Sequence, residues 1–106
     1  MSEIVNLPIV VTADAAIAAA KSVFSDTRIL WDVINANSGQ LAKDLIGMAP
    51  TSGKKIIVKI GGRSIVAIEQ DRHGQELLVS RPLGSVGAAC ADLKFLMKGE
   101  DDVFLN

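Results

Sequence analysis

The stretch "KKIIVKIGGRSIVAIEQDRHGQELLVSR", residues 54–81, predicts three β-strands joined by two turns. Its apolar runs are rich in valine and isoleucine, which favour strands. The glycine pair at 61–62 and the polar run at 71–74 separate these runs and have the composition of turns. The stretch is therefore expected to form an antiparallel meander.

The strand register decides which side chains share a face of this meander. We expect Ile60 to pair with Arg63 across the first turn and Gln70 with Gln75 across the second, and alternation fixes the other pairs. One face then carries Ile56, Val58, Ile60, Ile65, Ala67 and Leu78. The opposite face carries Ile57, Val66, Ile68, Leu77 and Val79. Neither face is polar in its middle, as a face exposed to water would be.

Two explanations for the second apolar face remain open. The helices of the chain cover both faces, or they cover one face while another protein surface covers the second. In the second case the predicted interface contains the five residues just named, together with Phe104. Its rim, which is also a candidate anion-binding site, contains Lys55, Lys59, Arg63 and Arg81.

Two helices and a strand are predicted before the meander. Residues 3–11 are β-rich, and Pro8 restricts them to an edge strand or an extended arm. Thr12 has the character of an N-cap for a helix ending near Phe24. Residues 25–48 show apolar residues at helical spacing, interrupted by "NANSG" at 35–39, which predicts a second, kinked helix.

A further helix is predicted after the meander. Ser85 is its expected N-cap and Gly99 its expected end. Its apolar stripe contains Val86, Ala89, Cys90, Leu93, Leu96 and Met97. The tail "EDDVFLN" that follows combines three acids with an apolar run. We expect Phe104 to dock on the core of its own chain or on a neighbouring subunit, where the acids would meet Lys59, Arg63 or Arg81.

These elements predict the α+β class in one domain spanning residues 1–106. The expected architecture is a three-stranded antiparallel meander, with a possible N-terminal edge strand, packed with two N-terminal helices and one C-terminal helix. The length of 106 residues suits a single compact core.

Composition narrows the class of function. Apolar residues make up 49% of the chain and charged residues 22%, which is typical of a globular protein. The apolar runs are far shorter than the ~20 residues that span a bilayer, so no membrane contact is expected. A single cysteine and an acidic start without a basic leader favour a cytoplasmic setting, or the interior of an assembled particle. The net charge of −1 argues against nucleic-acid binding through bulk charge.

Three catalytic patterns are tested and rejected. The segment "GMAPTSGKK" at 47–55 has the wrong spacing for a phosphate-binding loop and precedes a strand. Cys90, on an apolar helix stripe, and His73, in a turn, are the only Cys and His, so neither a thiol nucleophile nor a metal site is expected. Glu69 and Glu76 would face each other in the assumed register, but like charges in that position destabilise a sheet.

The sequence thus predicts a small non-enzymatic binding or assembly module without cofactors, for example an accessory or structural protein of a phage. The expected partner is another copy of the chain. One alternative is a nucleic-acid or anion-binding accessory protein that uses the basic meander, although residues 54–81 contain no aromatic side chain on which bases could stack. The other alternative is a minimal enzyme whose site is shared between subunits.

Overall fold

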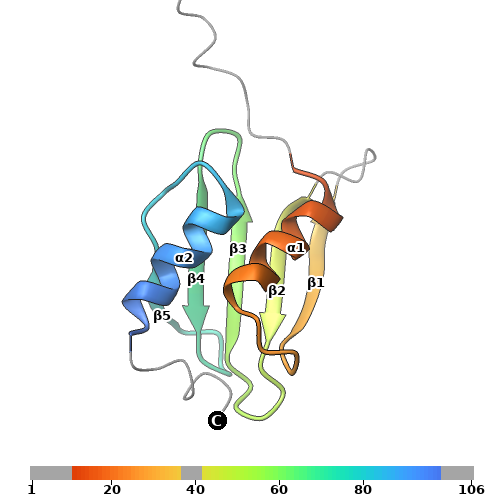
Figure 1. The fold of residues 1–106 in the computed structure, drawn as a ribbon. Coiled ribbons are helices and arrows are strands. Elements are labelled where there is room, and N and C mark those ends of the chain that lie inside the picture. The colour runs from red at the N-terminus through yellow and green to blue at the C-terminus, as the bar shows by residue number, and fades with distance from the viewer. Residues whose placement is uncertain (1–10, 37–41, 99–106) are drawn as a thin grey trace, which may run out of the picture.

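The chain folds into a helix, a five-stranded meander and a second helix (Figure 1). The computed structural model describes residues 11–36 and 42–98. The elements are α1 (Ala13–Val23), β1 (Leu30–Ala36), β2 (Ala42–Met48), β3 (Lys55–Ile60), β4 (Ile65–Gln70), β5 (Glu76–Val79) and α2 (Val86–Leu96).

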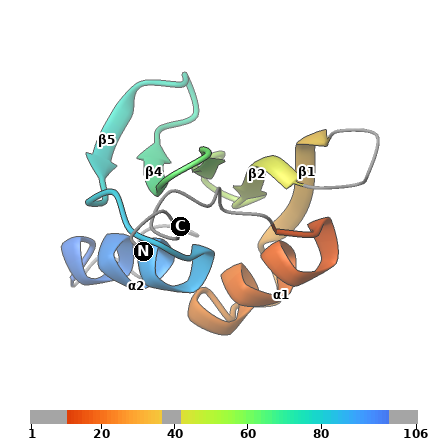
Figure 2. The same cartoon turned by 90° about the horizontal axis from the view of Figure 1, so that it is seen from above.

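The strands form one antiparallel sheet in the order β1-β2-β3-β4-β5. Both helices lie side by side on the same face of this sheet, so the domain has two layers (Figures 1 and 2). Among the described residues, no helix lies on the opposite face. The α+β class is therefore confirmed, and the question of what covers the second sheet face becomes a structural one.

The predictions for the first and last helices are confirmed. Thr12 caps α1, since its Oγ1 accepts a hydrogen bond from the N–H of Ala15 at 3.2 Å. Ser85 caps α2 in the same way, with its Oγ accepting from the N–H of Ala88 at 3.1 Å. The apolar stripe of α2 is buried, except that Leu96 is exposed where the pattern placed it inward.

The predicted three-stranded meander with three helices is wrong, because the segment expected to form a kinked helix forms the hairpin β1–β2. Residues 30–36 are rich in β-branched and aromatic side chains, and they alternate between the two faces of the sheet. Leu45 pairs with Val33 on one side and with Val58 on the other, and its side chain is completely buried in the core between the sheet and the helices. Residues 37–41, which include the last three residues of the "NANSG" segment, lie outside the described residues, as do residues 1–10 and 99–106.

Both assumed turn registers also differ from the structure. Ile60 pairs with Ile65 rather than Arg63, so the first turn has four residues, and the N–H of Gly61 donates to the carbonyl of Ser64 at 2.9 Å. The shift of two residues leaves every side chain on its predicted face. At the second turn Gln70 pairs with Glu76, and an irregularity follows Glu69.

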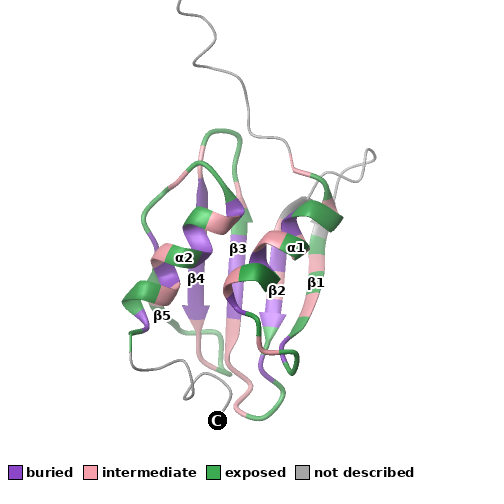
Figure 3. Ribbon diagram, viewed as in Figure 1, coloured by how far each residue is buried: buried purple, intermediate pink, exposed green. Residues whose placement is uncertain are grey.

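The core lies between the helices and the sheet. The helices contribute small residues together with Phe24, Leu93 and Met97, and the sheet contributes Leu45, Ile56, Val58, Ile65 and Ala67 (Figure 3). The face of the sheet that carries Ile56 and Val58 is thus the covered face, as residues 54–81 alone predicted. Small alanines on α1 and α2 allow the two helices to approach the sheet and each other closely.

Candidate interaction surface

The sheet face turned away from both helices is called here the open face. Alternation along each strand places its side chains opposite to those of the core. Among the described residues the open face carries Leu30, Asp32, Ile34, Asp44, Ile46, Met48, Lys55, Ile57, Lys59, Val66, Ile68, Gln70, Leu77 and Val79. Most of them are apolar, which is unusual for a sheet face that residues 11–36 and 42–98 leave uncovered.

A row of directly paired residues crosses all five strands in the middle of the open face. It runs through Asp32, Ile46, Ile57, Ile68 and Val79. Ile57 and Ile68 are only 8% and 5% exposed, although they do not belong to the core cluster. The centre of the row is therefore largely shielded from solvent.

Large apolar side chains are exposed toward the two edges of the open face. Leu30 and Ile34 on β1 are 61% and 50% exposed. On the opposite edge, Leu77 and Val79 on β5 are 43% and 47% exposed. The apolar surface accessible to a partner is therefore concentrated on the edge strands β1 and β5, on either side of the shielded isoleucines.

Charged residues of both signs lie within this apolar surface. Lys59 pairs with Asp44 on one side and with Val66 on the other. Lys55 lies between Met48 and Gln70. The residues named for the open face include two acids, Asp32 and Asp44, and two lysines, Lys55 and Lys59. Their formal charges therefore cancel.

The structure brings most of the predicted interface residues together. Five of them, Ile57, Val66, Ile68, Leu77 and Val79, share the open face with Lys55 and Lys59. Arg63 lies in the exposed turn between β3 and β4, and Phe104 lies outside the described residues.

Sequence reasoning missed the open-face residues of β1 and β2. These are Leu30, Ile34, Ile46 and Met48, which were all assigned to the kinked helix over residues 25–48. The available signal was the alternation in "LWDVIN". Trp31 and Val33 face the core cluster, whereas Leu30, Asp32 and Ile34 face away.

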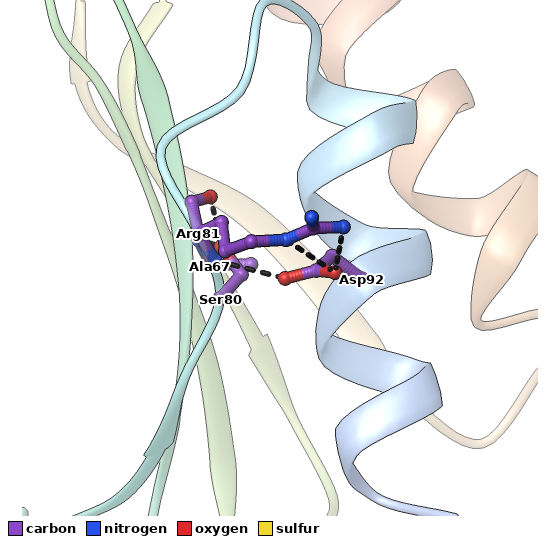
Figure 4. A network of polar contacts seen from close by, with 4 residues as sticks. All are labelled: Ala67, Ser80, Arg81 and Asp92. Atoms are coloured by element: carbon purple, nitrogen blue, oxygen red, sulfur yellow. Dashed lines mark hydrogen bonds and ion pairs between the residues drawn. The ribbon is translucent and has the colours of Figure 1, made fainter.

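Arg81, predicted at the rim, instead ties the end of β5 to α2 (Figure 4). Its Nη2 lies 2.8 Å and its Nε 3.1 Å from Oδ1 of Asp92, while its backbone N–H donates to Oδ2 at 2.8 Å. These hydrogen bonds raise the pKa of Arg81 and lower that of Asp92. The neighbouring Ser80 is buried, and its Oγ accepts from the N–H of Ala67 at 2.9 Å.

Glu69 and Glu76 do not form a carboxylate pair. Glu69 pairs with Leu78 and is buried on the helix side of the sheet, where its Oε2 lies 4.0 Å from Nζ of Lys54. Glu76 is exposed at the start of β5. The two carboxyl groups thus occupy different environments without sharing a site, and Glu69 belongs to a structural ion pair.

Cys90 and His73 lie in unrelated parts of the fold. Cys90 is fully buried in the core on α2, and burial raises the pKa of its thiol to about 12. A thiol with this pKa carries almost no thiolate near neutral pH, so it is a poor nucleophile. His73 lies in the exposed turn between β4 and β5. Within the described ranges, no group of three His, Cys, Asp or Glu side chains is arranged to hold a metal ion.

The chain matches no protein-family model, no curated protein and no solved structure. Neither α1 nor α2, the two helices in the described part of the chain, has the length and hydropathy needed to cross a bilayer.

Proposed function

We propose that this protein is a small, non-enzymatic assembly module that self-associates through the open face. One observation carries the proposal. Five strands present a largely apolar surface on which the described chain packs nothing of its own. A face of this kind favours burial against another protein surface, because water at apolar side chains is unfavourable.

The size of the open face is compatible with a specific contact. Five strands at their usual spacing, about six residues long, cover roughly 20 by 20 Å, or about 400 Å² in projection. Accessible surface exceeds projected area because side chains protrude, and a two-fold interface buries the same face on each copy. The contact would therefore lie toward the lower end of the range for specific protein pairs.

A second copy suits this face because its charges are balanced. Two acids and two lysines cancel on each copy, so no net repulsion opposes contact between two copies. The strongly apolar row between the charges is the same on both copies, as an isologous contact requires. Sheets that pack face to face in this way form a core about 10 Å thick.

The same observations weigh against nucleic acid as the main partner. The open-face residues named above include no aromatic side chain that would stack on bases. The basic residues of the meander also point to different places: Lys54 toward Glu69, Arg81 toward Asp92, and Lys55 and Lys59 onto the open face. They do not form the single positive stripe that follows a phosphate backbone.

Sedimentation equilibrium of the full chain tests the proposal. We expect the mass to rise from that of one chain, 11.2 kDa, toward at least twice that value as the concentration increases from micromolar to millimolar. Because apolar burial dominates, the association should persist at high salt. A mass of one chain throughout this range would contradict the proposal.

A further inference from the structure

The four charged side chains named for the open face are unevenly distributed over its strands. Both lysines lie on the central strand β3, whereas Asp32 lies on β1 and Asp44 on β2. Asp32 belongs to the middle row of paired residues, Lys55 to the row on one side of it, and Lys59 and Asp44 to the row on the other side. The orientation in which two copies dock therefore decides which charges meet.

Only a few orientations are available to two identical sheets that pack face to face. The two-fold axis that relates them lies between the sheets and parallel to both. Packed sheets have either aligned strands or strands that cross at about 90°. The axis therefore runs along the strands, across them, or along one of the two diagonals of the face. The contact is largest when the axis passes over Ile57, which lies in the middle row of the middle strand.

Both aligned orientations bring like charges together. With the axis along the strands, β3 lies on β3 of the second copy with its rows in the same order, so each lysine meets its own counterpart. With the axis across the strands, the order of the rows is reversed. Lys55 then meets Lys59, and Asp32 meets Asp32 of the second copy. Charges buried against like charges disfavour both orientations.

The two diagonal orientations differ in the corners of the face over which the axis passes. One axis passes over Asp44, so the two copies of this carboxylate would lie against each other. The other axis passes between Leu30 and Met48 at one corner, over Ile57 at the centre, and close to Val66 at the opposite corner. Only apolar side chains of the open face lie on this second diagonal.

The second diagonal also brings opposite charges together. Asp32 lies two strands from Ile57, about 10 Å, and Lys55 lies two residues from Ile57 along β3, about 7 Å. Rotation about the diagonal exchanges these two directions, so Asp32 of one copy lies within about 3 Å of Lys55 of the other in projection. Their side chains extend into the layer of about 10 Å between the sheets, and the two-fold axis makes the contact twice.

We propose that two copies dock with their strands nearly perpendicular, and that Asp32 of each copy forms an ion pair with Lys55 of the other. These ion pairs presuppose the self-association proposed above, and they determine its orientation. Lys59 meets no opposite charge of the second copy, but its cross-strand neighbour on its own copy is Asp44. Leu30, which is 61% exposed, lies against Met48 of the second copy in this orientation.

Mixing chains that carry single charge reversals tests this orientation. In a dimer of Asp32→Lys, two ammonium groups meet at each of the two contacts, and in a dimer of Lys55→Glu two carboxylates do. Each variant alone should therefore associate about tenfold more weakly than the wild type, or weaker still. In a pair formed by one chain of each variant, both contacts join opposite charges. We expect this mixed pair to associate about as tightly as the wild type, measured by sedimentation with a dye at the amino terminus of one variant.

Restored association would report contact between copies. Within one chain, Asp32 and Lys55 are separated by two strands and two residues, about 12 Å, which exceeds the distance of about 8 Å over which physiological salt screens charges. Both variants should fold, because Asp32 is exposed on an edge strand and Lys55 lies between the uncharged Met48 and Gln70. Circular dichroism at low concentration checks this.

The matched control is a mixture of Asp32→Lys with Lys59→Glu. Lys59→Glu has the same net charge as Lys55→Glu, but this mixture keeps one contact in which two ammonium groups meet, so its association should be weaker than that of the first mixture. If the wild type associates and the first mixture is no tighter than the control mixture, the orientation is wrong while the proposed function stands. A wild type that remains a single chain at millimolar concentration would overturn both.

Discussion

The double substitution Val66→Lys/Val79→Lys is expected to convert the self-associated protein into a folded monomer, weakening association by about 100-fold or more. Both valines lie on the open face, where Val79 pairs with Ile68 and Val66 pairs with Lys59. A two-fold contact would lose four partly exposed valines, at about 1 kcal/mol each. It would also have to bury four new ammonium groups without partners. Light scattering and sedimentation would measure the change.

The fold should survive this substitution because neither valine belongs to the core cluster. Circular dichroism should therefore be unchanged, while the melting temperature at low concentration should fall by a few degrees, because the lysine introduced at position 66 faces Lys59 across the strands. Leu96→Lys is the matched control. The Leu96 side chain is 43% exposed, similar to the 47% of Val79, but it lies on α2 and not on the open face. A double variant that associates as tightly as Leu96→Lys would place the interface elsewhere.

Gly47→Ala is expected to lower the free energy of unfolding by about 1–3 kcal/mol. Gly47 pairs with Trp31, whose ring lies across it so closely that a Cβ would stand 2.7 Å from two ring carbons. The ring would have to move, and its contact with Phe24, at 6.5 Å between centroids, would be disturbed. Thermal unfolding followed by circular dichroism should show a melting temperature several degrees lower.

Two further variants isolate the cause of this effect. Gly62→Ala should be nearly neutral, because no atom lies within 4 Å of a Cβ at that position. Trp31→Leu removes the obstructing ring, so adding Gly47→Ala to it should cost less than adding Gly47→Ala to the wild type. Strictly additive effects of the two substitutions would mean that contact with Trp31 is not the reason for glycine at this position.

Local sequence signals were sufficient to predict the helices α1 and α2 and the strands β3, β4 and β5. Thr12 and Ser85 mark helix starts because only short polar side chains cap the first free N–H groups. The face assignment of the meander was correct despite two wrong turn registers. At the first turn the error was a shift of two residues, and a strand shifted by two keeps its faces.

The hairpin β1–β2 was missed because its apolar residues fit two periods. Leu30, Val33, Ile34, Leu41 and Leu45 satisfy helical spacing, whereas Trp31 and Val33 alternate with Asp32 as in a strand. What favours the strands is pairing with β3, which buries Leu45 between two partners. This gain depends on residues distant in the sequence, so local propensity does not reveal it.

Because contacts between distant residues are not visible in local propensity, they also limited the prediction of which residues lie on the open face and of the Arg81–Asp92 pair. The open-face residues of β4 and β5 could be predicted from alternation, and those of β1 and β2 could not once a helix was assigned there. The pairing of Arg81 with Asp92 depends on how the chain turns after β5 and where α2 docks. No spacing rule links an arginine to an aspartate eleven residues later across a turn and half a helix.

The most direct test of the central claim is an isotope-filtered nuclear Overhauser measurement on a mixture of labelled and unlabelled chains. It detects only contacts between different copies. We expect intermolecular contacts from methyl groups of the open face, including those of Ile46, Ile57, Ile68 and Val79. Intermolecular contacts confined to other surfaces, or none at a concentration near millimolar, would contradict assembly through the open face of the sheet.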